Sequence, residues 1–263
     1  MSTESRSSTA TTPGSSPATA PASRRRRYVT FRIAAVVAAL TFLVLFNALP
    51  ALLTPWVDFA DTTDHGWART PELHRVADSG AALLMTGVAA ASVILAVRPT
   101  RNAATTMWLI STLTMIFLMS IGSSAIQGHD LMVAVITAAI LLGVFVVPLA
   151  LLSPDRRSLL RAGVTQAVGS AAPRPSRLVL LGLSCLMAAG PLLAVGVIAW
   201  RLSGGVFEAP QEDDVIGLAM LGASVALGAW LCLRAHEGWR ALAILLLAMT
   251  AYAVAAGVSL ALA

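Results

Sequence analysis

Seven long apolar runs limit what this chain can fold into more than any other feature. They cover residues 31–52, 80–97, 103–126, 131–152, 178–200, 215–233 and 241–263, each 18 to 24 residues long, and Arg32 is the one charged residue within them. A helix needs about 20 apolar residues to cross the hydrocarbon core of a bilayer, and its backbone must satisfy its own hydrogen bonds there. We therefore expect an all-α polytopic integral membrane protein, a bundle of seven transmembrane helices over residues 31–263.

The N-terminal segment differs sharply in composition from the rest. Residues 1–30 are rich in Ser, Thr, Ala and Pro and contain four consecutive arginines, Arg24 to Arg27. Such a segment buries too little apolar surface to offset the entropy of ordering it. We expect a disordered tail on the cytoplasmic side, followed by an uncleaved first span.

The charges alternate between the two sides of the predicted bundle. If the N-terminus is cytoplasmic, the inner segments hold 15 of the 18 arginines, whereas the outer segments hold ten of the 13 acidic residues. The net charge of +5 then resolves into +12 inside and −7 outside. Inner loops of membrane proteins carry the excess of basic residues, so the sequence predicts an N-in, C-out topology in the inner (plasma) membrane of a bacterium.

Aromatic and basic residues near the predicted membrane borders fit this orientation. Tryptophans concentrate at membrane interfaces, and we assign an interfacial position to Trp56, Trp108, Trp200, Trp230 and Trp239. In the inner loop 153–177, three arginines interleave with leucines, which favours a short interfacial helix that meets anionic lipid headgroups; these are Arg156, Arg157 and Arg161. The alternative for this loop is topology control alone.

Histidines and carboxylates gather on the predicted outer face. His65, His74 and Asp78 belong to the first outer loop and the start of the second helix, and His129 belongs to the next outer turn. Histidine with nearby carboxylates is the ligand set of zinc and similar divalent ions, and His74 with His129 has the chemistry of axial haem ligands. These four residues are therefore candidate metal ligands, and His74 and His129 are candidate cofactor ligands. The alternative is solvated loop polarity with no metal or haem, and a local packing contact between His74 and Asp78.

Three local features give further expectations. Thr70 followed by Pro71 is a typical helix start, so the second helix should begin before its apolar run. The run 103–126 is the richest in Ser and Thr, and we expect it to be central in the bundle, with hydroxyls that let helices approach and bond across their interfaces. We interpret His236 as a solvated interface residue, and Cys185 and Cys232 as small buried apolar side chains.

Function is constrained mainly by what the sequence lacks. It has no recognised catalytic motif and no ionisable residue in the middle of a span, where proton relays and ion-coupled transporters have them. We expect a protein without catalytic activity that serves as an accessory, partner-binding or simple permease-like component, with the bilayer and possible membrane proteins as partners and no nucleic acid. The alternative is a metal- or haem-binding membrane redox protein with its site around His74 and His129.

Overall fold

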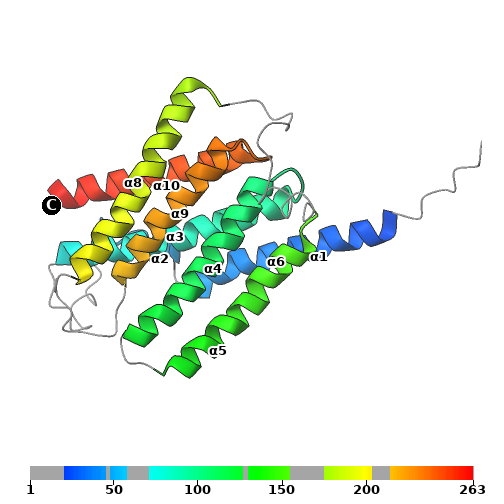
Figure 1. The fold of residues 1–263 in the computed structure, drawn as a ribbon, viewed down its shortest axis with the longest axis horizontal. Helices are drawn as coiled ribbons and strands as arrows, with labels where there is room; N and C mark the ends of the chain where they lie inside the picture. The colour runs from blue at the N-terminus through cyan, green and yellow to red at the C-terminus, as the bar shows by residue number, and fades with distance from the viewer. Residues whose placement is uncertain are drawn as a thin grey trace, which may run out of the picture.

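The computed structural model describes residues 21–45, 48–57, 71–126, 130–154, 175–202 and 214–262, and no strand occurs among them. The helices are α1 Pro21–Leu40, α2 Ala48–Ala51, α3 Pro71–Val97, α4 Ala103–Ile126, α5 Leu131–Leu141, α6 Val147–Leu152, α8 Arg177–Leu202, α9 Asp214–Leu233 and α10 Trp239–Leu262, with π-helical segments η1 Thr41–Leu45 and η3 Leu142–Val146. Within these ranges, seven segments are long and apolar enough to cross a membrane (Figure 1). The all-helical fold with seven candidate spans is confirmed.

The first span differs from the expected 31–52. Helix α1 begins at Pro21, inside the segment expected to be tail, and the stretch suited to a membrane is Arg26–Val44. The π-helical segment η1 follows α1 directly and closes this stretch. Among the described residues between η1 and α3, only the short helix α2 and a turn are present. The uninterrupted helix therefore ends earlier than the apolar run does, because hydropathy does not register a change in backbone geometry.

The two π-helical segments contact each other inside the bundle. The rings of Phe42 in η1 and Phe145 in η3 meet edge to face with their centroids 5.7 Å apart, and Phe117 of α4 stacks on Phe145 at 6.4 Å. Segment η3 ends at Val146, two residues before Pro148, which can donate no backbone hydrogen bond. Widened turns of this kind are a recognised way to accommodate a proline within a helix.

Helices α3, α4 and α9 form the centre of the bundle, which confirms the central position expected for the run 103–126. Trp108 of α4 is fully buried and donates its indole N–H to the backbone carbonyl of Ser224 in α9 over 2.8 Å. The interfacial position expected for Trp108 is therefore wrong. Its side chain lies in the core because the small residues Gly87 and Gly228 leave room beside it.

The hydroxyls of α4 were expected to bond across helix interfaces, but those that bond do so within their own helix. Thr114 and Ser120 donate to carbonyls four residues earlier in their own helix, at 2.8 and 2.9 Å. Thr105 and Thr112 are fully buried and find no partner among the described residues. Among these side chains no hydroxyl bond crosses to another helix, because the nearest acceptors are the carbonyls of α4 itself.

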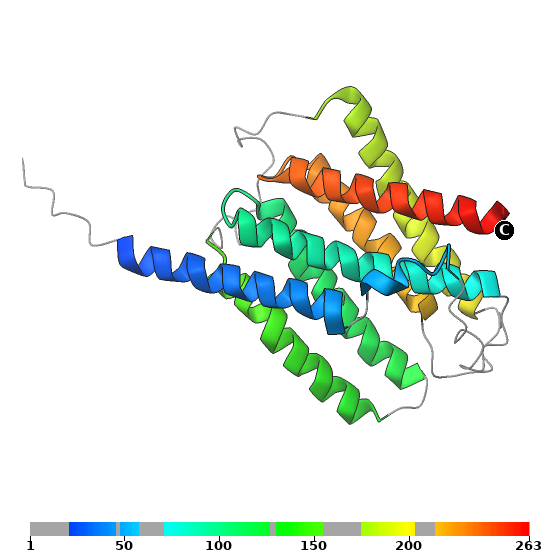
Figure 2. The same cartoon turned by 180° about the vertical axis from the view of Figure 1, so that it is seen from behind.

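Helix α8 lies at the edge of the bundle and packs mainly against α9. The two backbones touch where they cross: a Cβ added to Gly222 would lie 2.5 Å from the carbonyl oxygen of Gly190. Figures 1 and 2 show α8 inclined to α10 rather than parallel to it. Cys185 is exposed on α8, contrary to expectation, because little of this helix is buried among the described residues, whereas Cys232 is buried in α9 as expected.

The turns at residues 98–102 and 234–238 interlock at one end of the bundle, which we call the arginine-rich end because Arg98, Arg101, Arg234 and Arg240 lie there. The N–H of Ala104, at the start of α4, donates to the carbonyl of Glu237 over 2.9 Å. Gly238 takes a φ of +83°, and a Cβ there would collide with Asn102. The close packing of these turns makes the end a rigid unit.

His236 in this interlocked pair of turns is buried, so the expectation of a solvated residue is wrong. Its carbonyl accepts from the N–H of Trp239 over 3.0 Å and so helps to begin α10. Burial lowers the pKa of the imidazole, and the charge of Arg234 lowers it further. The neutral form is therefore the one that the fold favours.

The opposite end of the bundle is tied together by α2, α3 and α10. Arg75 Nε donates to the carbonyl of Thr54 over 2.8 Å, and the hydroxyl of Tyr252 donates to the carbonyl of Leu52 over 2.6 Å. The ring of Trp56 meets that of Tyr252 edge to face. Helix α3 begins at Pro71, as the Thr70–Pro71 pair predicts.

Candidate functional site

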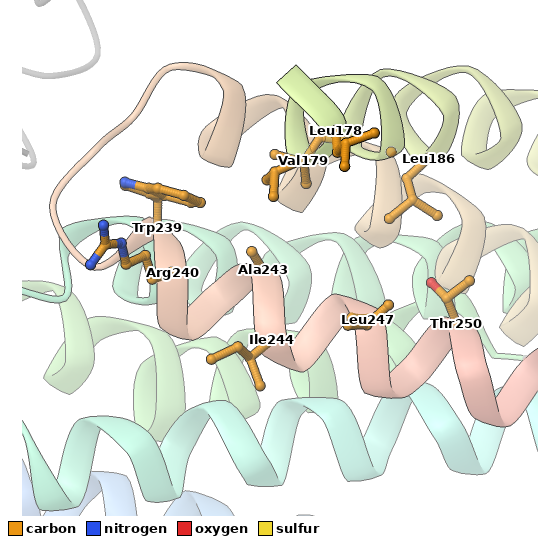
Figure 3. A pocket seen from close by; sticks show the side chains of 11 residues that line it. Leu178, Val179, Leu186, Trp239, Arg240, Ala243, Ile244, Leu247 and Thr250 are labelled. Carbon is orange, nitrogen blue, oxygen red and sulfur yellow. The ribbon is translucent and has the colours of Figure 1, made fainter. Parts of the chain in front are cut away.

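A cavity of about 640 Å³ lies between the N-terminal halves of α8 and α10, at the side of the bundle. Leu178, Val179, Gly182, Leu183 and Leu186 of α8 and Trp239, Arg240, Ala243, Ile244, Leu247 and Thr250 of α10 line it. Figure 3 shows Leu186 projecting from α8 toward α10, with Trp239 and Arg240 at the first turn of α10. The cavity exists because α8 leans on α9 and leaves its other face apart from α10.

A second cavity of about 200 Å³ lies next to the first one. The two share Leu186 and Thr250, and the second is lined further by residues from four helices: Leu83 of α3, Ala189, Gly190 and Leu193 of α8, Leu221, Gly222 and Val225 of α9, and Met249 and Ala253 of α10. We call the two cavities together the α8–α10 groove. It begins at the arginine-rich end and runs toward the middle of the bundle.

The length of the groove matches one half of a bilayer. From Trp239 to Thr250 the helix rises by roughly 16 Å, at 1.5 Å per residue. The hydrocarbon core of a membrane is about 30 Å thick, so one leaflet contributes about 15 Å. The main cavity is therefore about as long as a single leaflet is deep.

Among the described residues that line the groove, one is charged, and it lies at the arginine-rich end. Arg240 is exposed, and its guanidinium carbon lies 5.7 Å from the ring centre of Trp239. Trp239 is itself buried and forms the wall beside it. Arg177, at the first turn of α8, is also exposed at this end. The groove therefore joins a deep apolar channel to a positively charged rim.

The described lining residues offer little for catalysis. Thr250 and Arg240 are the polar side chains among them, and the Thr250 hydroxyl is engaged with the carbonyl of Leu246 at 2.8 Å. Arginine keeps its charge at any physiological pH and cannot act as a base. These groups suit binding: the channel has room for an apolar chain, and the guanidinium can donate hydrogen bonds to an anionic group.

The structure places only part of the site expected on the outer face. Asp78 is half-buried on α3, and His74 belongs to the same helix, but its side chain lies outside the described residues, as do His65 and His129. Arg156, Arg157 and Arg161 also lie outside them. Among the described residues no three His, Cys, Asp or Glu side chains come together to hold a metal ion.

Sequence reasoning did not find the groove. The sequence predicts an interfacial position for Trp239, and Arg240 is one of the 15 arginines of the predicted inner segments. The pairing of a Trp and an Arg at the start of a span is the available signal, but it is common to many membrane helices. What distinguishes this pair is the gap between α8 and α10, which only the packing of α8 on α9 creates.

Comparisons of the chain with protein-family models, with curated proteins and with solved structures give no match.

Proposed function

We propose that the protein is a non-catalytic accessory protein of the bacterial inner membrane that binds an anionic lipid in the α8–α10 groove. The observation that carries this proposal is the continuity of the apolar channel with the rim formed by Trp239 and Arg240. An acyl chain fills the channel, and an acidic headgroup pairs with the guanidinium.

The headgroup, rather than the chain, provides the selectivity. Lipid tails are as apolar as leucine, so an acyl chain gains little by moving from the bilayer into the groove. A basic residue near the membrane surface attracts an anionic lipid by about 1 kcal/mol, which is roughly a fivefold preference. We therefore expect Arg240 to account for most of the discrimination between lipids.

The proposed orientation decides which leaflet supplies the lipid. The arginine-rich end carries the inner loops of the N-in, C-out topology, and the excess of arginine there is the pattern of a cytoplasmic side. The lipid would then come from the cytoplasmic leaflet. Reporter fusions after residues 66, 165 and 263 test the topology, and a cytoplasmic C-terminus would contradict it.

The binding proposal is tested by native mass spectrometry of the full chain released from bilayers of equal phosphatidylglycerol and phosphatidylcholine. We expect bound phosphatidylglycerol to exceed phosphatidylcholine by roughly fivefold, and Arg240→Gln to remove the excess. Arg234→Gln is the matched control, because Arg234 also lies over a tryptophan at the same end, 5.2 Å from the ring of Trp230, but does not line the groove. Equal loss in both variants would indicate a general effect of surface charge.

A second pair of variants tests the channel itself. Ala243→Trp places a large ring in the groove, whereas Ala248→Trp places it on an exposed part of the same helix. We expect the first variant to lose the retained lipid and the second to keep it. Retention of lipid in Ala243→Trp would show that the lipid binds elsewhere.

The metal- or haem-binding alternative depends on His65, His74 and His129, and no contact of the described residues favours it. An absorption spectrum and a metal analysis of the purified protein test it directly. A Soret band or stoichiometric metal that disappears in His74→Ala would replace the proposal made above.

A further inference from the structure

A separate cavity of about 490 Å³ lies between α4 and α5, toward the end of the bundle opposite the arginine-rich end. Phe117, Ser120 and Ser124 of α4, Asp130, and Val133, Ala134, Thr137, Ala138 and Leu141 of α5 line it. It shares no lining residue with the α8–α10 groove. Ser124 and Asp130 lie near the ends of the two helices, Ser120 and Thr137 lie further along them, and Phe117, Ala138 and Leu141 form an apolar part.

The carboxylate of Asp130 can accept further hydrogen bonds at the rim of this cavity. Its Oδ1 caps helix α5 by accepting from the N–H groups of Met132 at 2.9 Å and Val133 at 3.3 Å. From the described residues, Oδ2 receives no hydrogen bond. One oxygen therefore holds the helix end, and because Asp130 is exposed, the other can accept a hydrogen bond from an incoming donor.

The serines of α4 add acceptors to the same wall. The hydroxyl hydrogen of Ser120 is donated to the carbonyl of Ile116, and that of Ser124 to the carbonyl of Ser120, both over 2.9 Å. With their hydrogens engaged, these hydroxyls offer oxygen lone pairs to a ligand. Together with Asp130 they form a wall that accepts hydrogen bonds and carries negative charge.

The apolar part of the cavity suits a short apolar stem. Phe117, Leu141 and Ala138 line it, and the ring of Phe117 is held by its stacking on Phe145. The partial negative charge at the end of α4 and the partial positive charge at the start of α5 oppose each other. The carboxylate of Asp130 therefore decides the sign of the field at the rim.

We propose that this cavity binds a primary ammonium group on a short apolar stem, with the ammonium hydrogens donated to Asp130 Oδ2 and to the serine oxygens. An ammonium has three donors and no acceptor, which is the complement of this wall. Two sources supply that chemistry: the headgroup of an ethanolamine lipid and a soluble alkylamine. The proposal does not depend on the α8–α10 groove, which recognises the opposite charge.

The test compares n-hexylammonium with n-hexyltrimethylammonium on the full chain in phosphatidylcholine nanodiscs, by isothermal titration calorimetry. Both probes have the same charge and stem, but the second has no N–H donor. We expect the primary ammonium to bind at least about tenfold tighter, because charge-assisted hydrogen bonds are among the stronger ones. Equal affinities, or no binding of either probe, would overturn the proposal.

Variants then locate the site. Asp130→Asn removes the charge but keeps an oxygen that caps α5, and we expect it to weaken binding of n-hexylammonium about tenfold. Glu237→Gln, which removes the same charge at the other end of the bundle, should leave binding unchanged. Ala134→Leu fills the cavity without touching a charge and should also abolish binding, so the proposal stays testable if Asp130→Asn folds poorly. Unchanged binding in Asp130→Asn or in Ala134→Leu would contradict the proposal.

Lipid binding distinguishes the two sources. In nanodiscs of equal phosphatidylethanolamine and phosphatidylcholine, both of which have no net charge, an excess of bound ethanolamine lipid that Asp130→Asn removes assigns the ligand to the membrane. Binding of n-hexylammonium without that excess assigns it to a soluble amine. Neither result depends on Arg240, so this proposal and the proposed function can fail separately.

Discussion

The contact of α8 with α9 at Gly190 gives the sharpest prediction of stability. A Cβ on Gly190 would lie 3.0 Å from the backbone N of Ala226 and closer still to the carbonyl oxygen of Gly222. In the reverse direction, a Cβ on Gly222 would lie 2.5 Å from the carbonyl oxygen of Gly190, about 1 Å closer than the 3.4 Å at which ordinary contact begins. These are backbone atoms that cannot rotate away, so Gly190→Ala must separate the helices by about 1 Å.

The expected cost of Gly190→Ala is about 1–3 kcal/mol, the usual range for overpacking a well-packed interface. Gly196→Ala is the matched control on the same helix, because its Cβ meets nothing within 4 Å. This control should be neutral or gain up to about 1 kcal/mol from the higher helix propensity of alanine. The two variants should therefore differ by about 1–4 kcal/mol.

A thiol-reactive dye measures this difference during heating. Cys232 is buried in the native protein and reacts only on unfolding, provided that the exposed Cys185 is first replaced by Ser. We expect Gly190→Ala to melt below Gly196→Ala, by roughly 2–4 °C for each kcal/mol. If the two variants melt together, or Gly190→Ala melts higher, the backbone contact does not exist in the folded protein and the reasoning is refuted.

Of three further predictions, two concern single hydrogen bonds and the third concerns the titration of one histidine. Trp108→Phe removes the indole donor to Ser224 and leaves unfilled space, so unfolding should become easier by about 1–3 kcal/mol in the same assay; an unchanged melting temperature would contradict its place in the core. Tyr252→Phe keeps the ring but loses the bond to the Leu52 carbonyl, and should cost about 1 kcal/mol, with no loss if that hydroxyl is solvated instead. The pKa of His236 is lowered in the folded protein. As pH falls below 6.5, the imidazole in the opened turn therefore takes up a proton at a higher pH than the imidazole in the folded turn does. The part of the stability of the interlocked turns that is linked to His236 is therefore complete above pH 6.5 and is lost as pH falls through the lowered pKa. Protection factors of the nearby amides, which correct hydrogen exchange for its intrinsic pH dependence, should fall over that range, and His236→Gln should abolish the fall.

The spans could be predicted from the sequence because length and hydropathy act locally. Each apolar run either spans the bilayer or leaves unpaired backbone groups in it, and the start of α3 at Pro71 follows from local capping chemistry. The first span shows where this reasoning stops. The run 31–52 is continuous in hydropathy, but the helix widens at Thr41–Leu45 where η1 packs against η3. That packing joins segments about a hundred residues apart, and the sequence of neither segment indicates it.

The candidate sites could not be predicted for the same reason. Charge patterning directed attention to the outer face, because histidines and acids gather there, yet the α8–α10 groove depends on the inclination of one helix. Its cause is the crossing at Gly190 and Gly222, and glycines of this kind are ordinary in membrane helices. In the sequence, Asp130 is one of the ten acidic residues of the outer segments; the cavity beside it depends on the packing of α4 against α5.

The long-range bonds of the core have a consequence for the order in which the protein is made. Trp108 bonds to a residue 116 positions later, Leu52 to one 200 positions later, and the amide of Ala104, in the first turn of α4, to a carbonyl in the turn before α10. A ribosome that has finished α6 has therefore released four spans and none of these partners. The core faces of the early spans therefore stay uncovered until the hairpin of α9 and α10 has been made and packs against them.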